Sequence, residues 1–281
     1  MSPTLPLPPV LARWYETEPT LETPGNRTWI SRGANFVVAL SKLEEGAELV
    51  RNDNPDEYVV LNDDVAVELS SADETLSAAA GSLSIVPPGK SRVVARGAGT
   101  AVCIFSSNAK DVLAAASNAE DYSRGAPLVA PLVSWPEPPG GYRLRTYVLA
   151  DHLVEGSIMR IFRTRSLMVN VLMPWTTPRD IHRLSPHSHD DFEQGSLALA
   201  SEWTHHLRFP WTPDMATWRE DQHIEIGHPS LTIIPPTVIH TSRNREPNGR
   251  LVDIFSPPRI DFSRTPGLVI NAADYPMPVD A

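Results

Sequence analysis

Cysteine and long apolar runs are nearly absent from this chain. The single cysteine, Cys103, cannot form a disulfide within the chain, and its apolar neighbours indicate a buried small side chain rather than a nucleophile. No apolar run approaches the roughly 18 residues that a membrane-spanning helix needs, so we expect no membrane span. The first residues lack a basic segment followed by an apolar core, which argues against a signal peptide and favours a cytoplasmic protein.

Basic residues are also scarce. The chain has 24 Lys and Arg against 34 Asp and Glu, a net charge of −10, which disfavours nucleic acids and anionic membranes as partners. We therefore expect a small-molecule substrate as the main partner, with a homodimer as a further option.

Histidine is missing from the whole first half: all nine histidines lie at or after His152. The run from Pro186 to Glu193 contains an H-x-H-x3-E pattern formed by His187, His189 and Glu193, and His240 follows downstream. Positions 187, 189 and 193 share parity, so an extended strand projects all three side chains to one face. Imidazole nitrogens with a carboxylate oxygen, and no thiolate, suit one divalent transition metal: Fe, or Zn, Mn or Ni.

The chain contains an internal repeat. Ser82–Pro88 (SLSIVPP) matches Ser230–Pro236 (SLTIIPP), and Val102–Ser106 (VCIFS) matches Val252–Ser256 (VDIFS). Upstream, Glu57 stands where Glu193 stands in the second copy. Three pairs of matching segments in the same order indicate duplication of one unit. A chain of 281 residues is long enough for two domains.

Each copy reads as a set of short strands. β-branched segments bounded by turn residues predict strands at 35–40, 57–61, 65–69 and 92–95, and again at 168–172, 197–199, 231–234 and 251–255. Only 109–116 reads as a helix, and 28 prolines disfavour long helices. We predict an all-β protein of two tandem antiparallel β-barrels. The expected parts are a lead-in (1–28), a first barrel (29–120), a linker (121–142), a second barrel (143–258) and a tail (259–281).

The second copy resembles the cupin superfamily. The H-x-H-x3-E run, the stretch Gly227–Pro236, and then His240 and Asn244 are similar to the paired cupin motifs, and the whole chain resembles a bicupin. The resemblance implies two jelly-roll barrels, with a divalent metal held inside the second one by His187, His189, Glu193 and His240. Two details depart from the motif: the expected glycine is replaced near Ala200, and the usual Pro-x-Gly reads Pro-Pro-Thr.

The first copy lacks these ligands. Aligned on Glu57, the two histidine positions hold Arg51 and Asp53, and Arg92 stands at the last one. Because arginine is always protonated, it cannot bind a cation. We expect the first barrel to serve packing, dimerisation or a separate anion pocket.

Other residues are candidates for chemistry or substrate contact. His205 shares the apolar face of its strand and could move a proton together with Glu193, although a hydrogen-bonded core histidine explains it equally well. Arg163 and Arg183 could bind a carboxylate, or else lie on an exposed face. Trp211 lies in an insertion found only in the second copy, a candidate substrate wall. Asn244 is the fourth candidate for substrate contact.

Three functions remain open at this stage. The leading prediction, which rests mostly on the resemblance to cupin dioxygenases, is a dioxygenase-type oxidoreductase with a mixed His and Glu site walled by Trp, Phe and Met. A non-oxidative isomerase, lyase or decarboxylase fits a carboxylate or sugar-acid substrate near the arginines. A non-catalytic protein that binds a metal or small ligand is the third reading.

Overall fold

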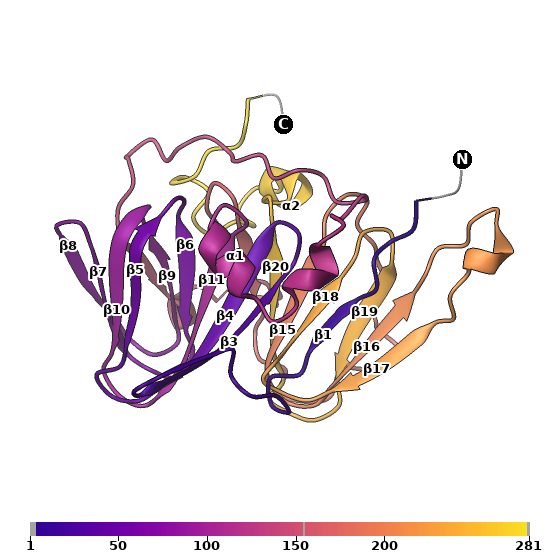
Figure 1. Cartoon of the computed structure of the whole chain (residues 1–281), viewed down its shortest axis with the longest axis horizontal. Helices are drawn as coiled ribbons and strands as arrows, with labels where there is room; N and C mark the ends of the chain where they lie inside the picture. The colour runs from indigo at the N-terminus through magenta and orange to yellow at the C-terminus, as the bar shows by residue number, and fades with distance from the viewer. Residues whose placement is uncertain (1–3, 154, 280–281) are drawn as a thin grey trace.

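A computed structural model describes residues 4–153 and 155–279, and it is almost entirely β-structure (Figure 1). The predicted all-β fold is therefore confirmed, and each predicted strand segment overlaps a strand. The first domain contains β2 (Leu21–Thr23), β3 (Asn26–Arg32), β4 (Phe36–Leu43), β5 (Glu48–Asn54), β6 (Tyr58–Asn62), β7 (Val67–Ser71), β8 (Glu74–Ala78), β9 (Ser82–Val86), β10 (Gly89–Ala95), β11 (Gly99–Ser106), α1 (Lys110–Ala115) and η1 (Ala119–Tyr122). The second contains β13 (Ile161–Arg163), β14 (Met168–Val171), β15 (Gln194–Ala200), β16 (Trp203–Arg208), η3 (Met215–Thr217), β17 (Gln222–Ile226), β18 (Ser230–Ile234), β19 (Ile239–Asn244), β20 (Arg250–Phe255) and α2 (Ile260–Arg264).

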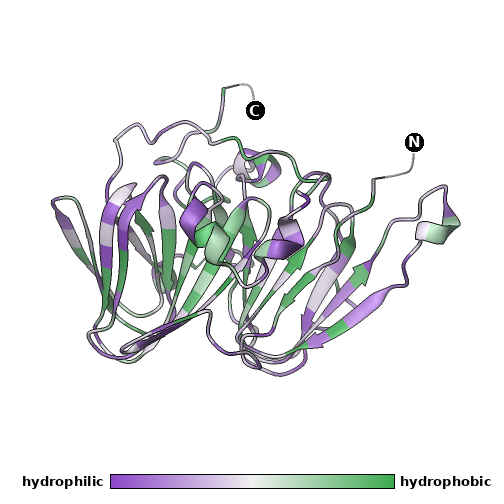
Figure 2. Cartoon of the chain, viewed as in Figure 1, coloured by the Kyte–Doolittle hydropathy of each residue, from purple (hydrophilic) through white to green (hydrophobic). Residues whose placement is uncertain are grey.

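Each domain is a sandwich of a large and a small antiparallel sheet. The first pairs a seven-stranded sheet, β12-β9-β6-β11-β4-β3-β2, with a four-stranded sheet, β5-β10-β7-β8. The second pairs a six-stranded sheet, β1-β18-β15-β20-β14-β13, with a three-stranded sheet, β17-β16-β19. Hydrophobic residues gather on the strands in the middle of the molecule, whereas the outer strands and the loops carry many hydrophilic ones (Figure 2). Among the described residues, no helix is long and apolar enough to cross a membrane.

The two domains exchange edge strands. β1 (Val10–Ala12), from the lead-in, pairs with β18 of the second domain, with Val10 opposite Ile233. β12 (Arg145–Val148), followed by η2 (Leu149–Asp151), pairs with β9 of the first domain. Because β9 and β18 are the repeated SLSIV and SLTII segments, the exchange follows the internal symmetry. The strand that opens the expected second barrel thus completes the first sheet, and the residue limits of the two barrels stay a proposal.

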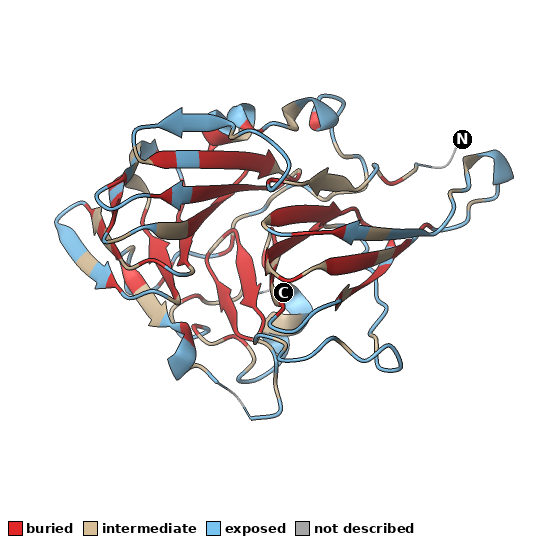
Figure 3. Ribbon diagram, turned by 90° about the horizontal axis from the view of Figure 1, so that it is seen from below, coloured by how far each residue is buried: buried red, intermediate tan, exposed pale blue. Residues whose placement is uncertain are grey.

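The main hydrophobic core lies between the domains. The two large sheets contribute buried side chains such as Val38, Val59 and Ile104 from one domain and Leu197 and Ile233 from the other. Buried strands are concentrated where the domains meet (Figure 3). Full burial of such a side chain stabilises a fold by about 1.5–3 kcal/mol, so this shared core ties the domains together.

The interior of the first domain is filled by its own side chains. Tyr58 stacks on Phe105 with ring centroids 4.8 Å apart and hydrogen-bonds to Ser91, and Cys103 is buried beside them. In the repeat alignment, Tyr58 and Cys103 correspond to Gln194 and Asp253. The second domain therefore carries polar side chains where the first carries packing residues.

Candidate metal centre

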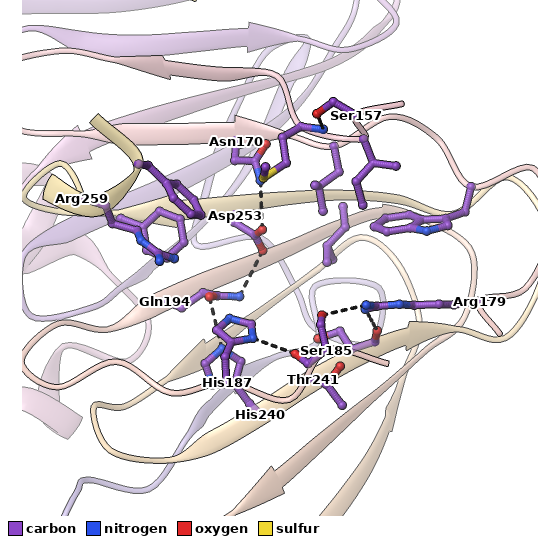
Figure 4. A pocket seen from close by; sticks show the side chains of 18 of the residues that line it. Ser157, Asn170, Arg179, Ser185, His187, Gln194, His240, Thr241, Asp253 and Arg259 are labelled. Atoms are coloured by element: carbon purple, nitrogen blue, oxygen red, sulfur yellow. Dashed lines mark hydrogen bonds between the residues drawn. The ribbon is translucent and has the colours of Figure 1, made fainter. Parts of the chain in front are cut away.

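A cavity of about 580 Å³ lies inside the second domain, between its two sheets (Figure 4). Strands β14, β15, β19 and β20 supply the polar residues Asn170, Gln194, His240, Thr241, Ser242 and Asp253, and segments outside the strands add Ser157, Arg179, Ser185, His187 and Arg259. The apolar part of the wall is formed by Ile158, Met159, Leu172, Trp175, Leu251, Phe255 and Phe262. The volume matches that of ordinary small-molecule sites.

Three histidines converge at one end of this cavity. His187, His189 and His240 each offer a ring nitrogen, and these atoms lie within 4.8 Å of one another. Backbone hydrogen bonds in both directions between His187 and His240, at 3.0 and 2.7 Å, fix the loop against β19. The ring of Phe192 stacks on His189 with centroids 4.6 Å apart, which holds that imidazole in place.

Two of the three histidines, His189 and His240, are neutral and so can bind a cation. Burial lowers the pKa of His189 to about 4 and that of His240 to about 3, so both rings are uncharged at neutral pH. His187 and His240 each place Nδ1 2.9 Å from a backbone carbonyl, those of Ser185 and Val238. A proton on each Nδ1 leaves the Nε2 lone pair free, as a metal ligand requires.

Gln194 places a further oxygen beside the histidines. Its amide nitrogen donates to Asp253 and Ser196, each at 3.1 Å, which turns Oε1 toward the histidines. Oε1 lies 3.0 Å from Nε2 of His189 and 3.2 Å from Nε2 of His240. With the proton of His240 on Nδ1, lone pairs of its Nε2 and of Oε1 face one another, an arrangement that repels unless a cation lies between them. Three imidazoles and an amide oxygen fit Fe, Mn, Zn or Ni.

Glu193, predicted as a ligand and catalytic residue, is not brought to the histidines. Its buried carboxylate accepts hydrogen bonds from Tyr122 Oη at 2.9 Å and from Ala34 N at 2.6 Å, both from the first domain. Positions 189 and 193 do not face the same side, as the alternation along an extended strand predicted, because the backbone bends at Asp190 and Asp191 before β15 begins at Gln194. Gln194 therefore points into the barrel, opposite to the outward orientation that parity from His189 gives it.

Glu193 instead belongs to a symmetric pair of contacts between domains. Tyr122 follows the last strand of the first domain and donates to Glu193. Tyr275 follows the last strand of the second domain and donates to Glu57 Oε1 at 2.7 Å. The repeated glutamates thus hold the tail of the opposite domain rather than a metal.

His205 lies inside the barrel but does not line the cavity. It is fully buried in β16, and its Nδ1 is 2.7 Å from Ser242 Oγ, while Nε2 has no partner among the described residues. Ser242 does line the cavity. The arrangement leaves a proton-carrying role for His205 as a prediction, acting through Ser242.

The four predicted substrate contacts lie elsewhere. Arg163 is buried, donates to the carbonyl of Tyr275 and stacks over Trp135, so it anchors the tail. Arg183 is exposed and outside the cavity wall. Trp211 is 76% exposed and stacks on Trp218 at the tip of the β16–β17 hairpin. Asn244 is buried and bonds the backbone of Thr177, Arg179 and Glu246, so it shapes the loop over the cavity.

Sequence reasoning missed Asp253 as a site residue. Asp253 accepts from Asn170 at 3.4 Å and from Gln194 at 3.1 Å, and burial raises its pKa to about 7. The signal was available: the repeat places a lone aspartate, within an apolar strand, where the first copy has Cys103.

Comparisons with known proteins support the fold. No family model and no curated protein sequence matches the chain. Among solved structures it is similar to Ylba from E. coli (TM-score 0.61, 11% identity, covering 89% of this chain and 91% of that one). It is also similar to the Lactobacillus farciminis oxalate decarboxylase formate complex (0.58, 13%, 92% and 88%) and to AerE from Microcystis aeruginosa (0.57, 11%, 90% and 99%).

These likenesses concern the fold of the chain. The chain has the fold of the cupin superfamily, with two jelly rolls in tandem, as its motifs indicated. It carries a histidine triad able to bind a metal in the second one, and identities this low show the fold alone.

Proposed function

We propose that the chain is a metal-dependent enzyme that performs non-oxidative chemistry, as an isomerase, lyase or decarboxylase, on a small organic substrate. The observation that carries the proposal is the position of Asp253. This carboxylate lines the cavity and is hydrogen-bonded to Gln194, whose carbonyl faces the histidines.

Different residues of the cavity would bind the metal, transfer the proton and exclude water. His187, His189, His240 and Gln194 would hold the divalent metal, Fe, Mn, Zn or Ni, which supplies Lewis acidity for a developing negative charge on the substrate. Asp253 accepts a proton from the substrate and returns it to the product. Asn170 and Gln194 orient that carboxylate. The apolar wall around Trp175 and Phe255 keeps bulk water away from the reacting atoms.

A dioxygenase is the second candidate, favoured by the aromatic surroundings of the histidines. Phe192 stacks on His189, and Phe255 lies edge-on with its ring centroid 5.7 Å from that of His189. Such a dry, aromatic pocket suits a conjugated substrate that reacts with oxygen.

Metal content and oxygen dependence test both candidates. We expect about one metal per chain by elemental analysis, lost in His240→Ala and retained in His182→Ala, whose histidine is exposed. Exchange of substrate hydrogen with solvent deuterium under anaerobic conditions, abolished by Asp253→Asn, supports the non-oxidative reaction. Turnover that consumes oxygen overturns it in favour of the dioxygenase. Metal absent from the wild type overturns both.

A homodimer, a cytoplasmic location, and the exclusion of nucleic-acid and membrane partners stay predictions from the sequence. The comparison with oxalate decarboxylase in a formate complex is consistent with a small-molecule ligand. It says nothing about oligomeric state or cellular compartment.

A further inference from the structure

Arg179 is a cationic side chain of the cavity wall that has no carboxylate partner. Its Nη1 donates to the carbonyl of Ser242 and its Nη2 to Ser185 Oγ, both at 2.8 Å. Within residues 4–153 and 155–279, no Asp or Glu lies at ion-pairing distance from it. A guanidinium has five N–H groups, so donors remain available for a ligand.

The second arginine of the wall, Arg259, is already neutralised. It pairs with Asp261 at 2.6 Å, and its guanidinium stacks on the ring of Phe262, 3.7 Å from the centroid. Figure 4 shows Arg179 and Arg259 on opposite sides of the cavity, with Gln194 and Asp253 between them. Among the described residues, Arg179 is therefore the wall cation without an ion pair, and the carboxylate whose charge acts on it, Asp253, lies beyond ion-pairing distance.

The surroundings favour an anion beside Arg179. The guanidinium is partly buried, and this desolvation lowers its pKa without removing its charge. The backbone N–H of Arg179 donates to Asn244 Oδ1 at 3.0 Å, which holds the residue at the cavity wall. A partly desolvated cation of fixed position binds a carboxylate with charge-assisted hydrogen bonds.

The rest of the wall determines which chemical groups the ligand can carry besides its carboxylate. Ile158, Met159, Leu172, Trp175 and Leu251 give an apolar lining, and the cavity is about 580 Å³. A hydroxyl group placed against these five side chains would have no partner, at a cost of about 1–3 kcal/mol, and the polar part of the wall around Asn170, Thr241 and Ser242 could pair only those hydroxyl groups of a sugar acid that face it. A two-carbon dianion would leave most of the cavity unfilled.

We infer that the cavity binds a monocarboxylate with an apolar aryl or branched alkyl body, and that Arg179 binds its carboxylate. The inference rests on the proposed function in one respect, that the substrate occupies the cavity beside the histidines. It narrows the carboxylate or sugar-acid alternative to the apolar acids, and it assigns the specificity to a residue in the loop between β14 and β15.

Ligand binding tests this without any knowledge of the reaction. Phenylacetate, its neutral isostere phenylacetamide, and oxalate are titrated by calorimetry into wild-type protein, Arg179→Gln, Arg179→Lys and Arg183→Gln. Arg183 is the matched control, an exposed arginine four positions along the same loop. We expect phenylacetate to bind best, about tenfold or more weaker in Arg179→Gln, partly restored in Arg179→Lys and unchanged in Arg183→Gln.

Equal binding of the acid and the amide overturns the inference, and so does tighter binding of oxalate than of phenylacetate. If Arg179→Gln does not fold, the comparison of acid with amide on the wild type decides alone. The same titration on metal-free His240→Ala separates the two proposals. Retained phenylacetate binding there supports the role of Arg179 even where catalysis fails. If the wild type contains metal but binds phenylacetate and phenylacetamide equally well, the proposed function stands and the inference about Arg179 is wrong.

Discussion

Glu57 offers a quantitative test of the contact between the two domains. Its side chain is fully buried, and burial raises its pKa from 4.5 to about 7. The hydrogen bond from Tyr275 and the charge of Arg145 lower the pKa, Asp56 raises it, and a backbone hydrogen bond from Arg165 lowers it. The folded protein therefore holds a proton at Glu57 that the unfolded chain releases at lower pH.

The free energy of unfolding should fall as pH rises through this window. Between pH 4.5 and about 7 the folded state binds more protons at Glu57 than the unfolded state, which makes the slope negative. The full shift corresponds to about 3 kcal/mol above both pKa values. Glu57→Gln cannot titrate, yet its carbonyl oxygen still accepts from Tyr275. The variant should gain about 3 kcal/mol over the wild type from about pH 4 to about pH 8.

Urea denaturation at several pH values measures this difference, in which all other titrating groups cancel. The exposed Glu45→Gln serves as the control and should keep a constant offset from the wild type. If the difference in unfolding free energy between Glu57→Gln and the wild type does not change with pH, the raised pKa of Glu57 in the folded state is refuted.

Four further substitutions test the assignments at the metal centre, at the contact between the domains and at the hairpin tip. Gln194→Ala should weaken metal binding about 10–100-fold by competition with a chelator, whereas Glu193→Gln should leave it unchanged; the reverse result would restore Glu193 as the ligand. Tyr122→Phe should lower the free energy of unfolding by about 1–3 kcal/mol in denaturant titrations, since it leaves the buried Glu193 short of a donor. Trp211→Ser should change stability by less than about 0.5 kcal/mol and leave phenylacetate binding unaltered, and a clear loss in calorimetry would place the hairpin tip over the cavity.

The strands and the tandem fold could be predicted because their signals are local or repeated. The echo of SLSIVPP in SLTIIPP marked two equivalent strands, and the alternating segments around them marked their neighbours. The sequence could not show that Gln194 rather than Glu193 faces the histidines, because this depends on two bends at Asp190 and Asp191 that change which of two adjacent side chains faces inward. The contact of Arg163 could not be predicted for another reason, because its partner, Tyr275, is far away in the chain.

The exchanged strands have a consequence for synthesis on the ribosome. Residues Val10–Ala12 pair with β18, so this segment must wait until residues beyond Ile234 have emerged. At about 5–20 residues per second, that delay is roughly 10 to 40 seconds. Throughout it, the buried face of the first large sheet has no second sheet to cover it, and the nascent chain exposes an apolar surface that chaperones bind. Neither half is a complete folding unit, so we expect that cutting the gene between the repeats yields two insoluble fragments that recover only when they are expressed together.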